Sequence, residues 1–181
     1  MLQTNSVLGE ILSVRASLYM GSKVRIIDVL WHDGTHLLDA IMFLTDSIAV
    51  HRKHFGANVK SKEGTAYLSG FLKPKIPDGK KIPFVIETGA GRDHLVFEIE
   101  VSLSKGRLRI GNGVFEVWGS SECTYAAGFR SLAKTTGGFE GPTGYFANMA
   151  ANAAACVRNP SLKPDSTADD ALAVIKYLSC L

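Results

Sequence analysis

The residues best suited to bind a ligand lie in the stretch TAYLSGFLK, residues 65–73. Side chains alternate between the two faces of a strand, so Tyr67, Phe71 and Lys73 share one face while small and aliphatic residues occupy the other. Two aromatic rings beside a cation are what a surface needs to stack bases and contact phosphates. The alternative is that a helix or another sheet covers the two rings, which leaves Lys73 as a charge at the strand end.

Positive charge is concentrated around this strand. The segment 52–81 holds eight cations and only two acidic residues, although the whole chain has a formal net charge of only +3. Its cations are Arg52, Lys53, Lys60, Lys62, Lys73, Lys75, Lys80 and Lys81. The segment therefore indicates either a solvated surface or a site for an anionic partner such as nucleic acid.

The histidines show the spacing of metal ligands but not the expected geometry. His32 and His36 flank Asp33-Gly34, and a two-residue hairpin turn at that dipeptide would point the two imidazoles to opposite sides. His51 and His54 could face one way on a helix, but no third ligand is close in the sequence. We therefore expect no metal site.

The same hairpin would place the carboxylates of Asp28 and Asp39 opposite each other. Such a pair can share a proton or bind a cation, but like charges directly opposite also destabilise a sheet. A shifted register that exposes one or both carboxylates is the preferred interpretation.

Catalytic motifs are missing from the chain. There is no G-x-S-x-G elbow and no H-E-x-x-H helix, and the three cysteines, Cys123, Cys156 and Cys180, form no C-x-x-C pair. We therefore expect a binding protein rather than an enzyme, with no catalytic residue, no cofactor and reduced thiols.

The glycine-rich run from Lys134 leads into alanines rather than into a phosphate site. It lacks the G-x-x-x-x-G-K-[ST] and G-x-G-x-x-G spacings, so we interpret it as a joint between two kinds of structure. Within it, GGFEGPTGYF is similar to the glycine-rich signature of allene oxide cyclase and dirigent barrels, although in those families the motif leads into a strand.

Most of the chain reads as strands. Apolar residues in the first two thirds recur with period two or in short runs, and KVRIIDVLW and HLLDAIMFL flank the hairpin signal HDGT. The segments DHLVFEIEVSL, GRLRI and GVFEVW predict a three-stranded meander.

The C-terminal part predicts helices. Alanine dominates residues 142–157, and Ala168, Ala171, Leu172, Ile175 and Leu178 recur at helical spacing in a second segment. We therefore divide the chain into a β-barrel domain, residues 1–135, and a helical pair packed on the same core, residues 136–181.

The order of the elements resembles single-stranded DNA-binding proteins of the oligonucleotide-binding (OB) fold. A long first strand, a hairpin, a short helical stretch and then TAYLSGFLKP followed by the basic loop KPKIPDGKK carry this likeness over roughly residues 5–90. The resemblance implies a binding surface on Tyr67, Phe71, Lys73, Lys75, Lys80 and Lys81, with Trp31 and Arg25 on the neighbouring hairpin. The acidic tail common in the bacterial family is replaced by helices.

These observations together predict an α+β fold, namely a mainly antiparallel, OB-like β-barrel with two C-terminal helices. The expected function is non-enzymatic binding of single-stranded DNA or RNA in the cytoplasm, because the N-terminus has neither a signal sequence nor a membrane span. Two alternatives stay open: a closed barrel with a small apolar ligand or a cyclase or isomerase site, and a structural or assembly subunit. A homo-oligomer is compatible with each.

Overall fold

The computed structural model describes residues 7–21, 24–56, 58, 60–137 and 145–179. It contains eight strands and three helices within these residues. In chain order they are β1 (Ile11–Gly21), α1 (Ile26–Thr45), β2 (Ser47–Gly56), β3 (Gly64–Pro74), β4 (Ile82–Arg92), β5 (Val96–Leu103), β6 (Gly106–Gly111), β7 (Val114–Glu122), β8 (Arg130–Gly137), α2 (Tyr145–Arg158) and α3 (Ala168–Leu178).

All eight strands belong to one open sheet with the order β2-β3-β4-β1-β5-β6-β7-β8. The pair β1 and β4 is parallel, and every other neighbouring pair is antiparallel. The edge strands β2 and β8 do not pair with each other in the described residues, so the sheet does not close. The expected OB-like antiparallel barrel is therefore wrong, because parallel pairing of β1 with β4 opens the strand order into a mixed sheet.

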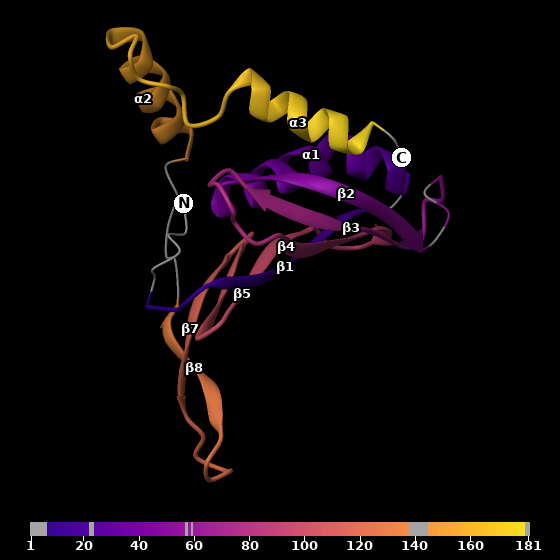
Figure 1. Cartoon of the computed structure of the whole chain (residues 1–181). Helices are drawn as coiled ribbons and strands as arrows, with labels where there is room; N and C mark the ends of the chain where they lie inside the picture. The colour runs from indigo at the N-terminus through magenta and orange to yellow at the C-terminus, as the bar shows by residue number, and fades with distance from the viewer. Residues whose placement is uncertain (1–6, 22–23, 57, 59, 138–144, 180–181) are drawn as a thin grey trace.

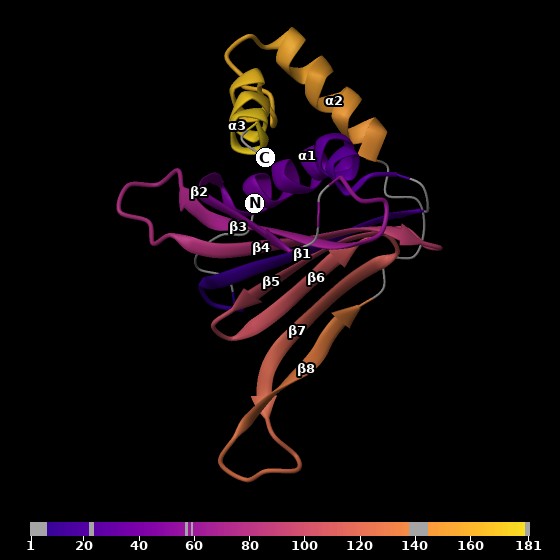
Figure 2. The same cartoon turned by 90° about the vertical axis from the view of Figure 1, so that its right-hand side faces the viewer.

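Helices cover only one face of this sheet. Figures 1 and 2 show α1 and α3 on one side of the strands, while the hairpin of β7 and β8 extends away on the other side. The hydrophobic core lies between the helices and the sheet, and it joins Leu18 of β1, Leu68 of β3 and Val101 of β5 to Leu38 of α1 and Leu178 of α3. The opposite face of the sheet carries both charged and apolar side chains of the same strands, such as Arg15, Glu98 and Phe71.

The segment expected to form a hairpin is one continuous helix, α1. Its residues Ile26, Leu30, Leu37 and Ile41 are fully buried, at the spacing of one helical face against the sheet. Gly34 lies in the middle of that face, and a Cβ there would meet Leu18 at an ordinary distance of 3.8 Å. The turn expected at Asp33-Gly34 does not form, because a helix buries this apolar stripe against the sheet and a hairpin would not.

Two parts of the chain extend from the core. The turn between β7 and β8 exposes 85% of Tyr125 and 72% of Phe129, and Figure 1 shows this hairpin as a long arm. The helix α2 makes no extensive contact with the sheet or the other helices among the described residues. In contrast, α3 begins with a capping box at Thr167 and Asp170 and inserts Val174 into the core.

None of the helices in the described residues is long and apolar enough to cross a membrane.

Candidate functional site

The outward side of α1 brings titratable groups together. Arg25, Asp28, His32 and His36 follow one another at three- and four-residue spacing, so they form one row along the helix, which we call the histidine face. His32 is 83% exposed, His36 is also exposed, and Trp31 beside them is 41% exposed. Two imidazoles one helical turn apart are therefore accessible to a ligand from outside.

Charged contacts surround the first part of the histidine face. The guanidinium of Arg25 donates to both carboxylate oxygens of Asp28 at 2.7 Å, and this contact holds the pKa of Asp28 below its usual range. The Nδ1 atom of His32 lies 3.2 Å from a carboxylate oxygen of Asp33. The hydroxyl of Thr35 donates to the backbone carbonyl of His32 at 2.8 Å. The site thus combines two accessible imidazoles with the carboxylate of Asp28, which Arg25 keeps ionised.

A second group of charges lies where the end of α1 meets the start of α3. Lys75 donates to Asp170 at 3.0 Å and lies 4.0 Å from Asp46, so it joins the β3–β4 loop to both helices. Asp39 lines the same cleft, and burial together with the nearby Asp170 raises the pKa of its carboxyl. The cleft has a volume of about 30 Å³, which leaves room for little more than one water molecule, so its role is structural.

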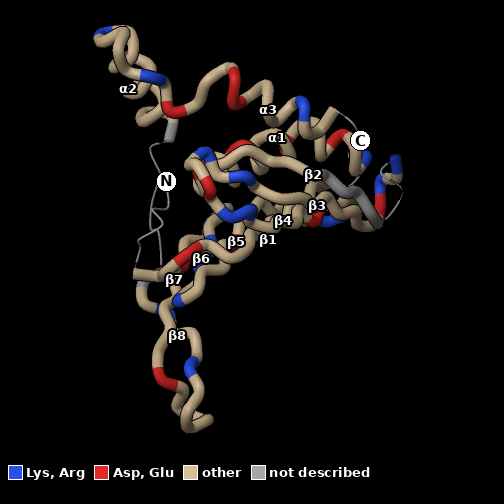
Figure 3. The backbone as a smooth tube through the Cα atoms, viewed as in Figure 1, with Lys and Arg blue, Asp and Glu red and all other residues tan. Residues whose placement is uncertain are grey.

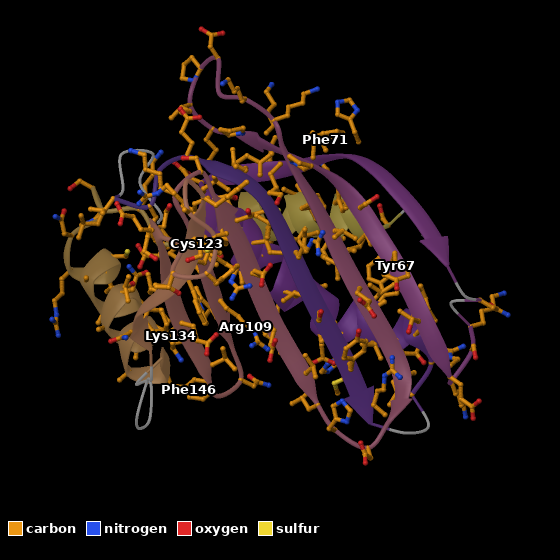
Figure 4. All side chains as sticks on the ribbon, turned by 90° about the horizontal axis from the view of Figure 1, so that it is seen from below. Tyr67, Phe71, Arg109, Cys123, Lys134 and Phe146 are labelled. Carbon is orange, nitrogen blue, oxygen red and sulfur yellow. The ribbon has the colours of Figure 1, made fainter. Side chains whose placement is uncertain are left out.

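The structure separates the residues that the sequence assigned to nucleic-acid binding. Tyr67, Phe71 and Lys73 do share the face of β3 that the helices leave uncovered, and Figure 4 shows Tyr67 and Phe71 on that side. Lys75 instead pairs with Asp170 near the helices, and Lys81 lies 3.0 Å from the ring of His51. Lys80 is exposed in the turn between β3 and β4.

The remaining assigned residues lie elsewhere. Trp31 is in α1 and Arg25 is its N-cap, so their expected place on a neighbouring hairpin is wrong. Arg52 and Lys53 belong to β2, and their side chains lie outside the described part of the structure. Figure 3 shows Lys and Arg interspersed with Asp and Glu rather than gathered on one surface.

Asp28 and Asp39 do not lie opposite each other, because both belong to the helix α1. On a helix these residues are separated by three turns; Asp28 pairs with Arg25, and Asp39 lies near the like charge of Asp170. No group of three or more potential metal ligands is present in the parts of the chain that are described. The glycine-rich residues 138–144 lie outside the described residues, and α2 follows them.

The histidine face was not predicted from the sequence, because a turn expected at Asp33-Gly34 would separate His32 from His36. The available signal was the helical spacing of Ile26, Leu30, Leu37 and Ile41, which places His32 and His36 together on the opposite side.

Comparisons with known proteins were made by sequence and by structure. No protein-family model and no curated protein matches the sequence. Among solved structures, a dehydrogenase from Chromobacterium violaceum matches 98% of this chain with a TM-score of 0.67 and 11% identity, over 54% of its own length. A putative NADPH-dependent oxidoreductase from Desulfitobacterium hafniense matches 95% of this chain with a TM-score of 0.60 and 14% identity, over 55% of its length.

The super-repressor mutant of Gal80p from Saccharomyces cerevisiae also matches 95% of this chain, with a TM-score of 0.63 and 11% identity, over 55% of its length. Since that protein is named as a repressor, the fold alone does not determine whether a chain is an enzyme. The matched structures are not OB-fold proteins, so the expected resemblance to single-stranded DNA-binding proteins, and with it the expected nucleic-acid function, is wrong.

The open sheet likewise excludes both barrel alternatives, the closed ligand barrel and the cyclase-type barrel. The chain therefore has the mixed-sheet fold found in about half the length of the dehydrogenases and oxidoreductases that it matches.

Proposed function

We propose that this chain works in an NAD(P)-dependent oxidoreductase and that the histidine face of α1 is its contribution to the reacting centre. The observation that carries the proposal is the exposed pair His32 and His36, one helical turn apart, on a fold shared with about half the length of such enzymes. Core histidines would be buried, and these two have their side chains directed away from the core.

The chemistry of such a reaction requires a group of this kind. When an alcohol is oxidised to a carbonyl, its hydroxyl proton must go to a base, and a bound nicotinamide would supply the acceptor for the hydride; the reverse reaction needs the same protein group as an acid. Imidazole has an ordinary pKa of about 6.5, so it performs both roles near neutral pH. Trp31 offers a flat apolar surface beside the imidazoles on which a substrate can rest.

The described residues do not fit the pyrophosphate of the nucleotide. The first turn of α1 is the place where a helix following a strand would hold phosphate, but the N–H of Ile26 there already donates to the carbonyl of Ser61 at 2.9 Å. The carboxylate of Asp28 in the same turn would repel an anion. We therefore place the nucleotide on a polypeptide segment other than these residues, and assign to this chain only proton transfer and substrate contact.

Thermal unfolding in the presence of candidate ligands tests the proposal. Ketones, aldehydes and the matching alcohols, including nucleotide-linked sugars, would be added with and without NADPH. A ligand that binds the folded state raises Tm, and we expect this rise to be lost in His36→Gln and in Trp31→Ala. His94→Gln, which changes an exposed histidine after β4, is the matched control and should keep it. A rise in Tm that survives both α1 variants would contradict the assignment.

A further inference from the structure

The face of the sheet away from α1 and α3 has charges arranged in stripes. Along the middle of this face each of six neighbouring strands presents one sign, and the sign alternates from strand to strand; at the end of β4, Arg92 lies over the ring of Tyr19. In sheet order the residues are Glu87 on β4, Arg15 on β1, Glu98 and Glu100 on β5, Arg107 and Arg109 on β6, Glu116 on β7 and Lys134 on β8. The four cations and four carboxylates leave these stripes with no net charge.

Ion pairs within the sheet hold most of the stripes in place. Arg109 contacts Glu98 at 2.6 Å and Glu116 at 3.9 Å, and Lys134 contacts Glu116 at 2.9 Å. Arg107 lies 3.6 Å from Glu100. These side chains are already ordered, so covering the face would cost little further side-chain entropy.

Arg15 differs from the other charges. Its side chain is exposed, and it forms no ion pair with any residue in the described part of the chain, although Glu100 is its register partner on β5. It lines a hollow of about 510 Å³ at the middle of the face, whose walls include Tyr67, Glu87 and Arg109. Figure 4 shows Tyr67 and Arg109 on either side of the strand β1. The centre of the face therefore has a cation with space around it and, among the described residues, no ionic partner.

The alternation of sign selects one way for two such faces to meet. A two-fold axis parallel to the strands, at the midpoint of the sheet between β1 and β5, places β1 over β5 of a second copy and β4 over β6. The stripes of β4, β1, β5 and β6 then each face a stripe of the opposite sign, while β7 and β8 lie over β3 and β2. An axis across the strands would instead place each strand over itself, so that like charges would meet.

We propose that two copies of this chain stack through the uncovered sheet face about an axis between β1 and β5. Rotation about this axis does not change the position of a residue along the strand direction. Arg15 therefore meets its register partner Glu100 on the second copy and fills the hollow at the centre. By the same register, Phe71 on β3 meets Trp118 on β7 of the second copy. The arm of β7 and β8 extends on the same side as this face, so it lies along the edge of the second copy.

Sedimentation equilibrium of the purified chain over a range of concentrations tests the stacking. The wild type should be a dimer, and Arg15→Glu should weaken the dimer at least ten-fold because two carboxylates would then meet at each contact. Lys176→Glu makes the same change of charge on the exposed side of α3 and should leave the dimer intact. A monomeric wild type, or equal dissociation constants for wild type and Arg15→Glu, would overturn the proposal.

A mixing experiment tests the axis itself. Glu100→Arg should also be monomeric, since two guanidinium groups would meet at each contact. In a mixture of Arg15→Glu with Glu100→Arg, every one of these contacts regains opposite signs, so we expect heterodimers from two monomeric variants. Circular dichroism confirms folding, and if Glu100→Arg does not fold, Arg15→Glu alone decides. Two folded variants that stay monomeric on mixing would rule out this axis.

Discussion

The hydroxyl of Tyr177 on α3 occupies the space beside Gly70 on β3. It donates to the carbonyl of Ser69 at 3.1 Å, and a Cβ at Gly70 would lie 2.1 Å from that oxygen and 2.8 Å from the carbonyl of Val50. The missing side chain of Gly70 thus lets α3 dock against the β2–β3 edge of the sheet.

Substitution of Gly70 should therefore weaken the fold. Gly70→Ala forces Tyr177 and the β2 backbone apart, and overpacking of this kind costs about 1–3 kcal/mol of the free energy of unfolding. Urea denaturation measures the change. Gly34→Ala is the control in α1, because a Cβ there has ordinary contacts from 3.5 Å and alanine favours a helix by roughly 0.8–1 kcal/mol. Equal effects of the two substitutions would show that α3 does not dock in this way.

Asp39 should make stability depend on pH. Burial, and then Asp170, raise the pKa of this carboxyl above its ordinary value of 3.8, so the folded chain keeps the proton to higher pH than the unfolded chain. The contribution of Asp39 to the free energy of unfolding is then fully present below pH 3.8, and it is lost as the pH rises through the pKa of this carboxyl in the folded chain. Asp39→Asn should accordingly raise Tm at neutral pH, and the gain should shrink as pH approaches 3.8.

The exposed turn variant Asp78→Asn is the control for this experiment, since asparagine tolerates the positive φ of 58° at that position. A gain in Tm for Asp39→Asn that is independent of pH would point to packing rather than to charge.

Tyr19 should ionise only at high pH. Burial, reinforced by its hydrogen bond to Glu87, raises the pKa of its phenol to about 12. Ultraviolet titration of the folded protein should therefore show a late ionisation that is lost in Tyr19→Phe, and folding should lose stability between pH 10.0 and about 12, where the unfolded chain releases this proton first. Glu87→Gln should lower the pKa of Tyr19 only in part because burial remains; full ionisation at pH 10 would contradict the described contact.

Local patterns predicted several elements of the fold. The alternation in TAYLSGFLK correctly placed Ala66, Leu68 and Leu72 in the core, and the meander from DHLVFEIEVSL to GVFEVW is confirmed as β5 to β7. These predictions succeeded because strand periodicity and short turns are encoded by neighbouring residues.

Long-range pairing was not predictable in the same way. Nothing adjacent to β1 in the sequence indicates that its parallel partner is β4. The apolar runs of α1 are compatible both with the helical period of 3.6 residues and with the strand period of two residues. The histidine face depended on that choice, because His32 and His36 diverge on a hairpin and align on a helix. Because the strand period was assumed for these residues, the candidate site was not predicted.

The most direct test of the proposed function is the NMR response of the histidine side chains to a substrate. A carbonyl compound that stabilises the protein, added together with NADPH, should shift the imidazole signals of His32 and His36 and leave that of His94 in place. Loss of those shifts in Trp31→Ala would place the ligand beside α1. Unchanged signals of His32 and His36 with a bound ligand would contradict the account and move the site away from the histidine face.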